Sequence, residues 1–283
     1  VPVIFYIFTS FQIFLIIIRN ILNLINFSGI FSKEMLFISN VLIPLMFDSF
    51  SSLMGFFSKI PGKNDIKKAA EVSYLIPLIG IIFGIIFSLL GIVLDFLPKP
   101  IFSVFMVILI YLILGLLHLD GLADFSDGIM VKGDREKKIR ALKDVNTGIA
   151  GTFSVVSVII IEIFSIFTLK LNYYSIFAFF IISELSAKFS MFFGLWEKYY
   201  PGGLGEIFFK NFKPYYIIIG ILYTSPFYFI FGYIYLISFT GIIISIIIKY
   251  ISLNNFGFVN GDVIGAMNEI SRSITMVILC LVL

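Results

Sequence analysis

The sequence contains little charge. Only 13% of its 283 residues are Asp, Glu, Lys or Arg, about half the share found in an ordinary soluble domain. Apolar residues make up 60% of the chain, and the mean hydropathy is +1.08. The single core of a soluble globule of this size could not bury so much apolar surface. The composition therefore excludes a soluble enzyme, a secreted module and a disordered chain, and it predicts an integral membrane protein.

Cysteine and histidine are nearly absent. Cys280 is the only cysteine, so the chain can form neither an internal disulfide nor a cysteine-based metal site. His118 is the only histidine, which excludes a histidine cluster. Any bound metal would therefore be a hard cation held by carboxylates. The net charge of +3 is too small to indicate nucleic acid as a partner.

Long apolar runs predict how often the chain crosses the lipid bilayer, since one helical crossing needs about 20 apolar residues. Candidate segments are 2–18, 36–57, 74–97, 101–117, 149–169, 173–195, 215–231, 233–248 and 268–283. We therefore predict an all-α, polytopic membrane helical bundle with about 7–9 transmembrane helices. We expect residues 35–283 to form a single membrane-embedded domain, which the motifs described below make the catalytic domain, and residues 1–34 to be either an extra helix or an over-extended start.

The basic residues predict the orientation in the membrane. Most of the 20 Lys and Arg side chains fall in four polar loops, at 58–73, 118–148, 196–214 and 249–262. Cytoplasmic loops carry an excess of such residues. We therefore expect a multi-pass protein of the cell (inner) membrane with its active-site loops in the cytoplasm.

Three aspartates follow one predicted span closely. Asp120, Asp124 and Asp127 are spaced i, i+4 and i+7, which on a helix places them within roughly 60° of one another. Like charges on one face repel, and a shared Mg²⁺ would relieve the repulsion while binding phosphate oxygens. The spacing thus predicts a magnesium site for phosphoryl-group chemistry. The alternative is a solvated acidic face balanced by the basic run at 132–143.

The neighbouring polar residues extend this candidate site. His118 is either a general base, a phosphate contact or an interfacial helix cap. Lys143 and Asp144 precede Gly148 and Gly151, and glycine amides at the start of a span can approach an anion. The alternative for the lysine is a positive-inside anchor beside a turn.

A third polar group begins the last apolar segment. Asp262 and Glu269 are seven residues apart and could join the metal site or hold a polar part of a substrate. The spacing of Gly261 and Gly265 is more typical of helix packing. With the loop glycines that precede them, the candidate substrate contacts are Gly203, Gly205, Gly261, Asp262 and Glu269.

These motifs carry a family resemblance. The string His118-Leu-Asp-Gly-Leu-Ala-Asp124, followed by Asp127-Gly128, Lys143-Asp144 and Gly148…Gly151, resembles the signature of the cobalamin synthase family of membrane enzymes. The later string Gly261-Asp262-x-x-Gly265-Ala266-x-x-Glu269 is similar to a second signature of that family. Weaker agreement covers residues 57–61, 77–80 and 203–205, so the resemblance extends from about residue 50 to the C-terminus.

The resemblance implies a reaction. Members of the family join adenosylcobinamide-GDP to α-ribazole, or to its 5′-phosphate, to give adenosylcobalamin or its 5′-phosphate, and they release GMP with the help of Mg²⁺. On this reading Asp120, Asp124 and Asp127 hold the metal, and His118, Lys143 and Asp144 are further catalytic residues. A homo-oligomer is compatible with the sequence, which leaves the oligomeric state open.

Two other functions remain open from the residues alone. A CDP-alcohol phosphotransferase also gathers aspartates at a span end, but here Asp124 stands where that pattern has arginine. A transporter would need charges deep in several spans. Glu162, Glu184 and Lys188 are the only candidates for such charges.

Overall fold

The computed structural model describes residues 43–283 except 64, 198, 201, 202 and 204. Over these residues the secondary structure is helical, apart from one isolated parallel bridge between Tyr199 and Val259. The predicted all-α class is therefore confirmed. The prediction for residues 1–34 and the candidate span at 2–18 lie outside the described residues.

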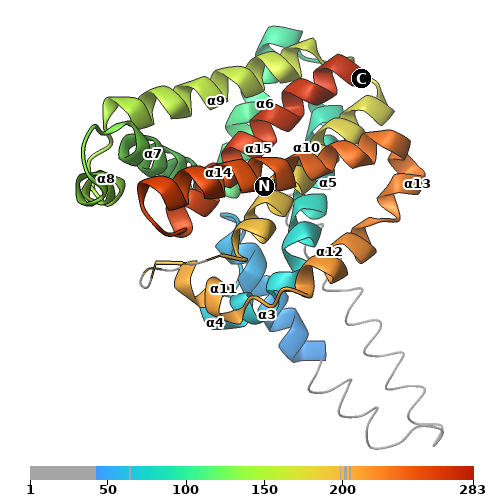
Figure 1. The fold of residues 1–283 in the computed structure, drawn as a ribbon. Helices are drawn as coiled ribbons and strands as arrows, with labels where there is room; N and C mark the ends of the chain where they lie inside the picture. Colours follow the sequence, from blue (N-terminus) through green and yellow to red (C-terminus); the bar gives the residue numbers. More distant parts are fainter. Residues whose placement is uncertain (1–42, 64, 198, 201–202, 204) are drawn as a thin grey trace, which may run out of the picture.

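The helices follow one another with short connections (Figure 1). In chain order they are α3 (Ile43–Phe56), α4 (Ile66–Glu71), η2 (Ser73–Leu75), α5 (Ile76–Leu94), α6 (Lys99–Leu114), α7 (Leu117–Met130), α8 (Arg135–Leu142), α9 (Ile149–Thr168), α10 (Tyr173–Gly194), α11 (Gly205–Asn211), α12 (Tyr216–Thr224), α13 (Phe227–Phe231), η3 (Gly232–Phe239), α14 (Thr240–Asn255) and α15 (Gly261–Val282).

The described residues contain five helical segments that are long and apolar enough to cross a membrane, or up to six if the bent pair α6–α7 forms one broken span. The five are Ser73–Leu94, Ile149–Thr168, Tyr173–Gly194, Phe227–Asn255 and Gly261–Val282. The finding supports a polytopic membrane protein, but the described part of the chain does not reach the predicted count.

One predicted span is divided. The apolar run 215–231 was expected to cross the membrane alone, but α12 contains only 9 residues and is about 14 Å long. Pro226 follows at the start of α13, where its ring and missing N–H stop the preceding helix. The second half of the run instead continues through η3 into α14 as one long apolar segment.

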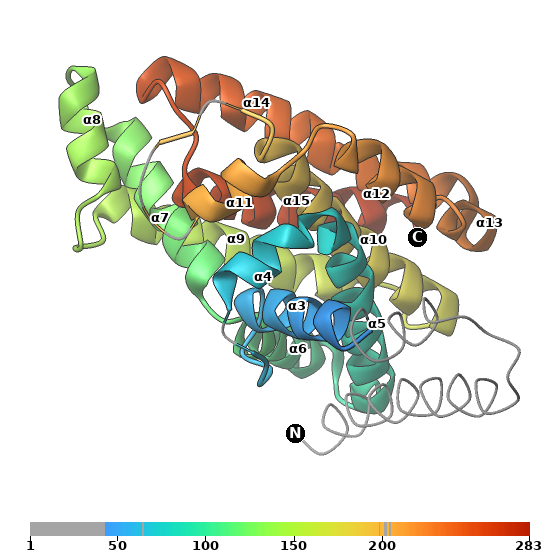
Figure 2. The same ribbon diagram turned by 90° about the horizontal axis from the view of Figure 1, so that it is seen from below.

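α10 is the central helix of the bundle, and 89% of its 18-residue apolar stretch is buried. It packs against α5, α14 and α15, while α15 also contacts α7 and α9 (Figures 1 and 2). The approach of α5 is very close, since a Cβ atom on Gly84 would lie 2.4 Å from the Cα atom of Ile181. Glycine is therefore required for this helix crossing.

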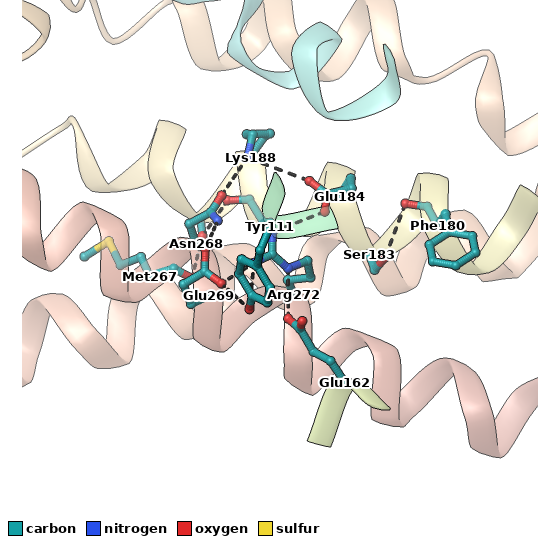
Figure 3. Close-up of polar contacts among 12 residues, drawn as sticks. Tyr111, Glu162, Phe180, Ser183, Glu184, Lys188, Met267, Asn268, Glu269 and Arg272 are labelled. Carbon is teal, nitrogen blue, oxygen red and sulfur yellow. Dashed lines mark hydrogen bonds and ion pairs between the residues drawn. The ribbon is translucent and has the colours of Figure 1, made fainter. Parts of the chain in front are cut away.

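Arg272 explains how α15 can carry a charge inside the bundle (Figure 3). Its guanidinium lies 2.9 Å from Glu162 of α9 and 3.3 Å from Glu184 of α10, and it also bonds to Glu269 one turn earlier. Lys188 completes the network, 3.8 Å from Glu184. Buried charges are tolerated when they face the bundle interior and are paired, so these residues join three helices.

Candidate active site

α7 carries the three aspartates and leaves α6 at an angle of 95°. The turn passes through Gly115, whose φ of 80° favours glycine. The predicted helix is confirmed, since it covers Leu117–Met130. We take α7 to lie outside the spanning segments, because three carboxyl groups on one face are costly in hydrocarbon.

Glycines bring α7 against the start of α15. A Cβ atom on Gly121 would lie 2.9 Å from the Cα atom of Asp262, and one on Gly265 would lie 3.2 Å from the Cα atom of His118. The two backbones therefore touch, and Asp262 lies beside the aspartates of α7. Gly265 has the packing role that its spacing suggested, whereas a Cβ atom on Gly261 would have nothing within 4 Å.

Asp124 is at the centre of this negative charge. Its pKa is raised from 3.8 to about 7, first by burial and then by Asp262, Asp120, Asp127 and Asp144. Each neighbouring carboxylate disfavours ionisation of the next. The fold thus concentrates five acidic side chains from three chain segments in one electrostatic environment.

The acid cluster has the donor chemistry that a hard divalent cation requires, since all its ligands would be carboxylate oxygens. In the part of the chain that the structure describes, no three His, Cys, Asp or Glu side chains are already arranged as a metal-binding group. The excess negative charge around Asp124 nevertheless fits a cation. The magnesium site at Asp120, Asp124 and Asp127 stays a prediction.

Asp127 holds the N-terminus of α9. Its Oδ2 atom accepts a hydrogen bond of 2.6 Å from the Gly148 amide, and its Oδ1 atom accepts one of 2.9 Å from the Gly151 amide. The two amides that the sequence assigned to a substrate phosphate therefore bind a protein carboxylate instead. Each oxygen of Asp127 still has a lone pair, so this capping is compatible with a second ligand.

Lys143 and Asp144 lie in the exposed loop between α8 and α9. The Lys143 ammonium lies 3.4 Å from the centroid of the Tyr200 ring, a favourable cation–π distance. Asp144 accepts hydrogen bonds of 3.0 Å from the backbone and side-chain nitrogens of Asn146. These bonds lower the pKa of Asp144, so the residue stays ionised and shapes the loop.

A cavity of about 460 Å³ lies next to the acid cluster. The aliphatic and aromatic wall residues are Phe56, Phe57, Ile76, Leu117, Met191, Leu195, Phe208, Phe209 and Ile264. The more polar lining consists of His118, Lys143, Tyr200, Asn260 and Asp262, together with Gly203, Gly205 and Gly261. Predicted substrate-binding residues from distant parts of the sequence therefore line one cavity.

Two loops close one side of the cavity. The Tyr200 amide donates a 3.1 Å hydrogen bond to the Val259 carbonyl. A Cβ atom on Gly205 would lie 3.3 Å from the Cα atom of Gly261. Gly205 therefore lies against Gly261, and both line the cavity together with Gly203.

His118 is buried in the first turn of α7 and lines the cavity. Its ring centroid lies 5.8 Å from that of Phe57. Burial, followed by the charges of Lys188 and Arg272, lowers the pKa of His118 well below its ordinary value. The imidazole is therefore neutral at pH 7, with one nitrogen that donates and one that accepts a hydrogen bond.

Glu269 lies in the buried ion network. The sequence paired it with Asp262 as a substrate contact, and the structure separates the two. Its carboxylate accepts a 2.9 Å hydrogen bond from the Tyr111 hydroxyl and a 2.8 Å bond from Asn268. Two helical turns separate Glu269 from Asp262, so only Asp262, near the start of α15, reaches the cavity.

Sequence reasoning missed several cavity residues. Asn260 caps α15 by accepting a 3.1 Å hydrogen bond from the Val263 amide, and its amide donates a 2.6 Å bond to Asp262. An asparagine directly before a periodic apolar segment is a recognisable cap signal. Tyr200 and Phe208 had no comparable signal in a chain with 14 Tyr and 35 Phe.

Comparison with known proteins gives a consistent result. The family described as cobalamin-5-phosphate synthase matches residues 49–280. A protein of Pyrococcus furiosus named adenosylcobinamide-GDP ribazoletransferase is 41% identical over 233 residues, which cover 81% of this chain and 97% of that protein. Proteins of the same name from Pyrococcus abyssi and Methanococcoides burtonii are 40% and 33% identical, over 81% and 80% of this chain and 96% and 89% of their own lengths. No solved structure matches the chain.

Proposed function

Because the chain belongs to the cobalamin-5-phosphate synthase family, we propose that it catalyses the final joining step of cobalamin synthesis. It is a transferase that links adenosylcobinamide-GDP to α-ribazole, or to α-ribazole 5′-phosphate, and releases GMP. The observation that carries this proposal is the family match across residues 49–280, which includes both the acid cluster and the cavity. No observation favours a CDP-alcohol phosphotransferase or a transporter.

The reaction exchanges one bond at phosphorus for another. A ribose hydroxyl oxygen of α-ribazole attacks the phosphorus atom on the corrinoid side of the pyrophosphate. The new O–P bond forms, the bond to the GMP oxygen breaks, and the hydroxyl proton passes to a base. Neutral His118 has a free basic nitrogen for this proton, and an ionised aspartate of the cluster is the second candidate.

The remaining residues orient the reactants. Lys143 is a positive charge at the cavity, where it binds phosphate oxygens as a point charge. Asp127 keeps the start of α9 against α7, which positions the loop that carries Lys143. Asp144 shapes the same loop through Asn146. The contacts of these three residues support the proposed roles.

Mg²⁺ is the cofactor of this proposal. Asp120 and Asp124 would hold it, with Asp127 through its remaining lone pairs and Asp262 as the nearest acid of α15. When bound, the metal neutralises charge on the pyrophosphate and on the departing GMP. Support comes from the excess of negative charge around Asp124, which a cation would relieve.

We further assign the protein to the cell membrane, with its active-site loops in the cytoplasm. The polar segments 118–148, 196–214 and 249–262, which carry the acid cluster and much of the cavity lining, contain half of the Lys and Arg residues, and cytoplasmic loops carry an excess of such residues. The nucleotide-linked substrate and the released GMP would then be exchanged with the cytoplasm.

The decisive experiment measures GMP release by the purified protein in lipid nanodiscs. Adenosylcobinamide-GDP is supplied with and without α-ribazole and with and without Mg²⁺, and the corrinoid products are separated by chromatography. We expect GMP and the joined cobalamin in equal amounts, only when both substrates and the metal are present. GMP release without α-ribazole would instead indicate a hydrolase, and product formation in a metal chelator would refute the cofactor assignment.

A further inference from the structure

We propose that the cavity beside the acid cluster binds the dimethylbenzimidazole base of α-ribazole, and that His118 donates a hydrogen bond to the unsubstituted ring nitrogen of that base. This inference rests on the proposed function, because that function supplies the substrates among which the cavity must choose. It adds the place of the acceptor nucleoside, the residues that contact its base and the source of its selectivity.

The size of the cavity excludes the corrin. A volume of about 460 Å³ is near the lower end of the range of about 300–1,000 Å³ for sites of small ligands. A nucleoside fits such a volume, whereas the corrin macrocycle with its amide side chains and adenosyl group does not. The cavity therefore accommodates either α-ribazole or the guanosine part of the other substrate.

The chemistry of the wall distinguishes these two nucleosides. Most of the wall is aliphatic or aromatic, and Phe56, Phe57 and Phe208 form one connected group with ring centroids 4.6–6.2 Å apart. Guanine would bury several donors and acceptors against this surface, and each polar group left without a partner there weakens binding. Dimethylbenzimidazole has two methyl groups, a flat bicyclic ring and one free acceptor nitrogen, so it matches the aromatic wall.

His118 provides the one polar group that this base needs. The side chain is only 7% exposed and lines the cavity. Neither of its ring nitrogens is among the fully buried side-chain atoms that lack a hydrogen-bond partner in the described part of the chain. Because His118 lines the cavity, a molecule bound there can form a hydrogen bond with its ring. An imidazole ring carries at least one N–H donor, and the base has one ring acceptor.

The polar lining then orients the sugar. Asp262 belongs both to the cavity and to the electrostatic environment of Asp124, and Lys143 lies at the cavity over the Tyr200 ring. With the base against the phenylalanines, the ribose extends towards these groups. Its attacking hydroxyl then lies on the side of the acid cluster, so that in this pose an ionised aspartate rather than His118 accepts its proton. A 5′-phosphate would meet Lys143.

The first test uses the wild-type protein and varies the acceptor. Turnover is measured with α-ribazole, with the riboside of benzimidazole, with the riboside of dimethylindole and with guanosine. We expect kcat/KM for the dimethylindole riboside to be about tenfold lower than for α-ribazole, since a buried donor left without its partner costs roughly 5- to 150-fold. Guanosine should be a poor acceptor. Equal turnover of α-ribazole and the dimethylindole riboside would overturn the role of His118.

The second test assigns the residues. Phe208→Leu should raise KM for α-ribazole about tenfold through loss of aromatic contact, with KM for adenosylcobinamide-GDP within twofold of wild type. Phe87→Leu is the matched control, because Phe87 is equally buried but packs on Phe83 and Phe180 outside the cavity. His118→Phe should lose the preference for α-ribazole over the dimethylindole riboside. This preference is a ratio of two kcat/KM values, so an effect of the substitution that slows both reactions equally cancels.

The outcomes separate this inference from the proposed function. If wild-type protein joins the two substrates but Phe208→Leu raises KM for adenosylcobinamide-GDP instead, the cavity binds the nucleotide-linked substrate and the inference is wrong. If neither KM changes, the base binds elsewhere. If wild-type protein forms no cobalamin at all, the proposed function itself fails.

Discussion

A Cβ atom on Gly121 would lie 2.9 Å from the Cα atom of Asp262, so α7 and α15 are in backbone contact where the acid cluster meets the cavity. Residues 141 positions apart in the chain thereby share one site. The glycine of the α7 motif is thus a packing residue, and the position of Asp262 relative to Asp124 depends on it.

Gly121→Ala should abolish activity because the added methyl group would push α15 away from α7. A displacement of about 1 Å near the reacting groups can cost about 100-fold in rate, so we expect a loss of at least that size. The measurement is GMP release at saturating substrates. Gly55→Ala is the control, since its Cβ atom would make only ordinary contacts of 3.5 Å and more. Comparable losses in both variants would contradict the packing argument.

Asp124→Asn should reduce GMP release about 100-fold or more, because it removes a carboxylate from the centre of the cluster and weakens charge stabilisation at the pyrophosphate. Insertion into the membrane should be unchanged, since the side chain keeps its size. Asp134→Asn is a matched control on the N-cap of α8, where asparagine also caps a helix well. Full turnover by Asp124→Asn would rule out its assigned role.

The requirement for Mg²⁺ should depend on pH. The pKa of Asp124 is about 7 without metal, so below this pH a proton competes with the cation for the carboxylate. If one proton competes with Mg²⁺ at a pKa of about 7, the Mg²⁺ concentration for half-maximal activity should rise about tenfold from pH 8 to pH 6. In metal-free protein the stability effect has the opposite sign: because folding raises the pKa of Asp124 from 3.8 to about 7, stability falls as the pH rises from about 4 to about 7 and is level above that.

Titrations of activity against Mg²⁺ at several pH values measure this dependence. Thermal unfolding of metal-free protein at the same pH values measures the effect on stability. Asp124→Asn cannot titrate at this position and provides the control for the unfolding experiment. A half-maximal Mg²⁺ concentration that stays constant from pH 6 to pH 8 would argue against Asp124 as a ligand.

Arg272→Leu should destabilise the bundle by about 3–5 kcal/mol, because Glu162, Glu184 and Glu269 would lose their shared buried partner. Thermal unfolding in detergent, together with the fraction of protein that elutes as one species, measures the loss. Lys210→Met is the control. It removes an exposed pair with Glu206 and should leave the unfolding temperature unchanged. A stable Arg272→Leu protein would show that the network contributes little to folding.

The sequence by itself determined the membrane class, the acidic face of α7 that carries Asp120, Asp124 and Asp127, and the motifs of the family. All three depend on local information, because composition, helical period and adjacent residues require no knowledge of distant partners. The face of α7 could be derived from three spacings alone. The partner helix that covers this face could not, since every apolar helix of the chain presents a similar surface.

Only the tertiary structure decided which predicted residues meet. Asp262 and Glu269 share one helical face, yet one lies at the cavity and the other in the buried ion network, because helix crossings differ two turns apart. The amides of Gly148 and Gly151 bind Asp127, a contact across more than 20 residues that no spacing indicates. The cavity likewise forms only where α3, α5, α7, α10, α11 and α15 converge, so its aromatic wall is a property of the packed bundle.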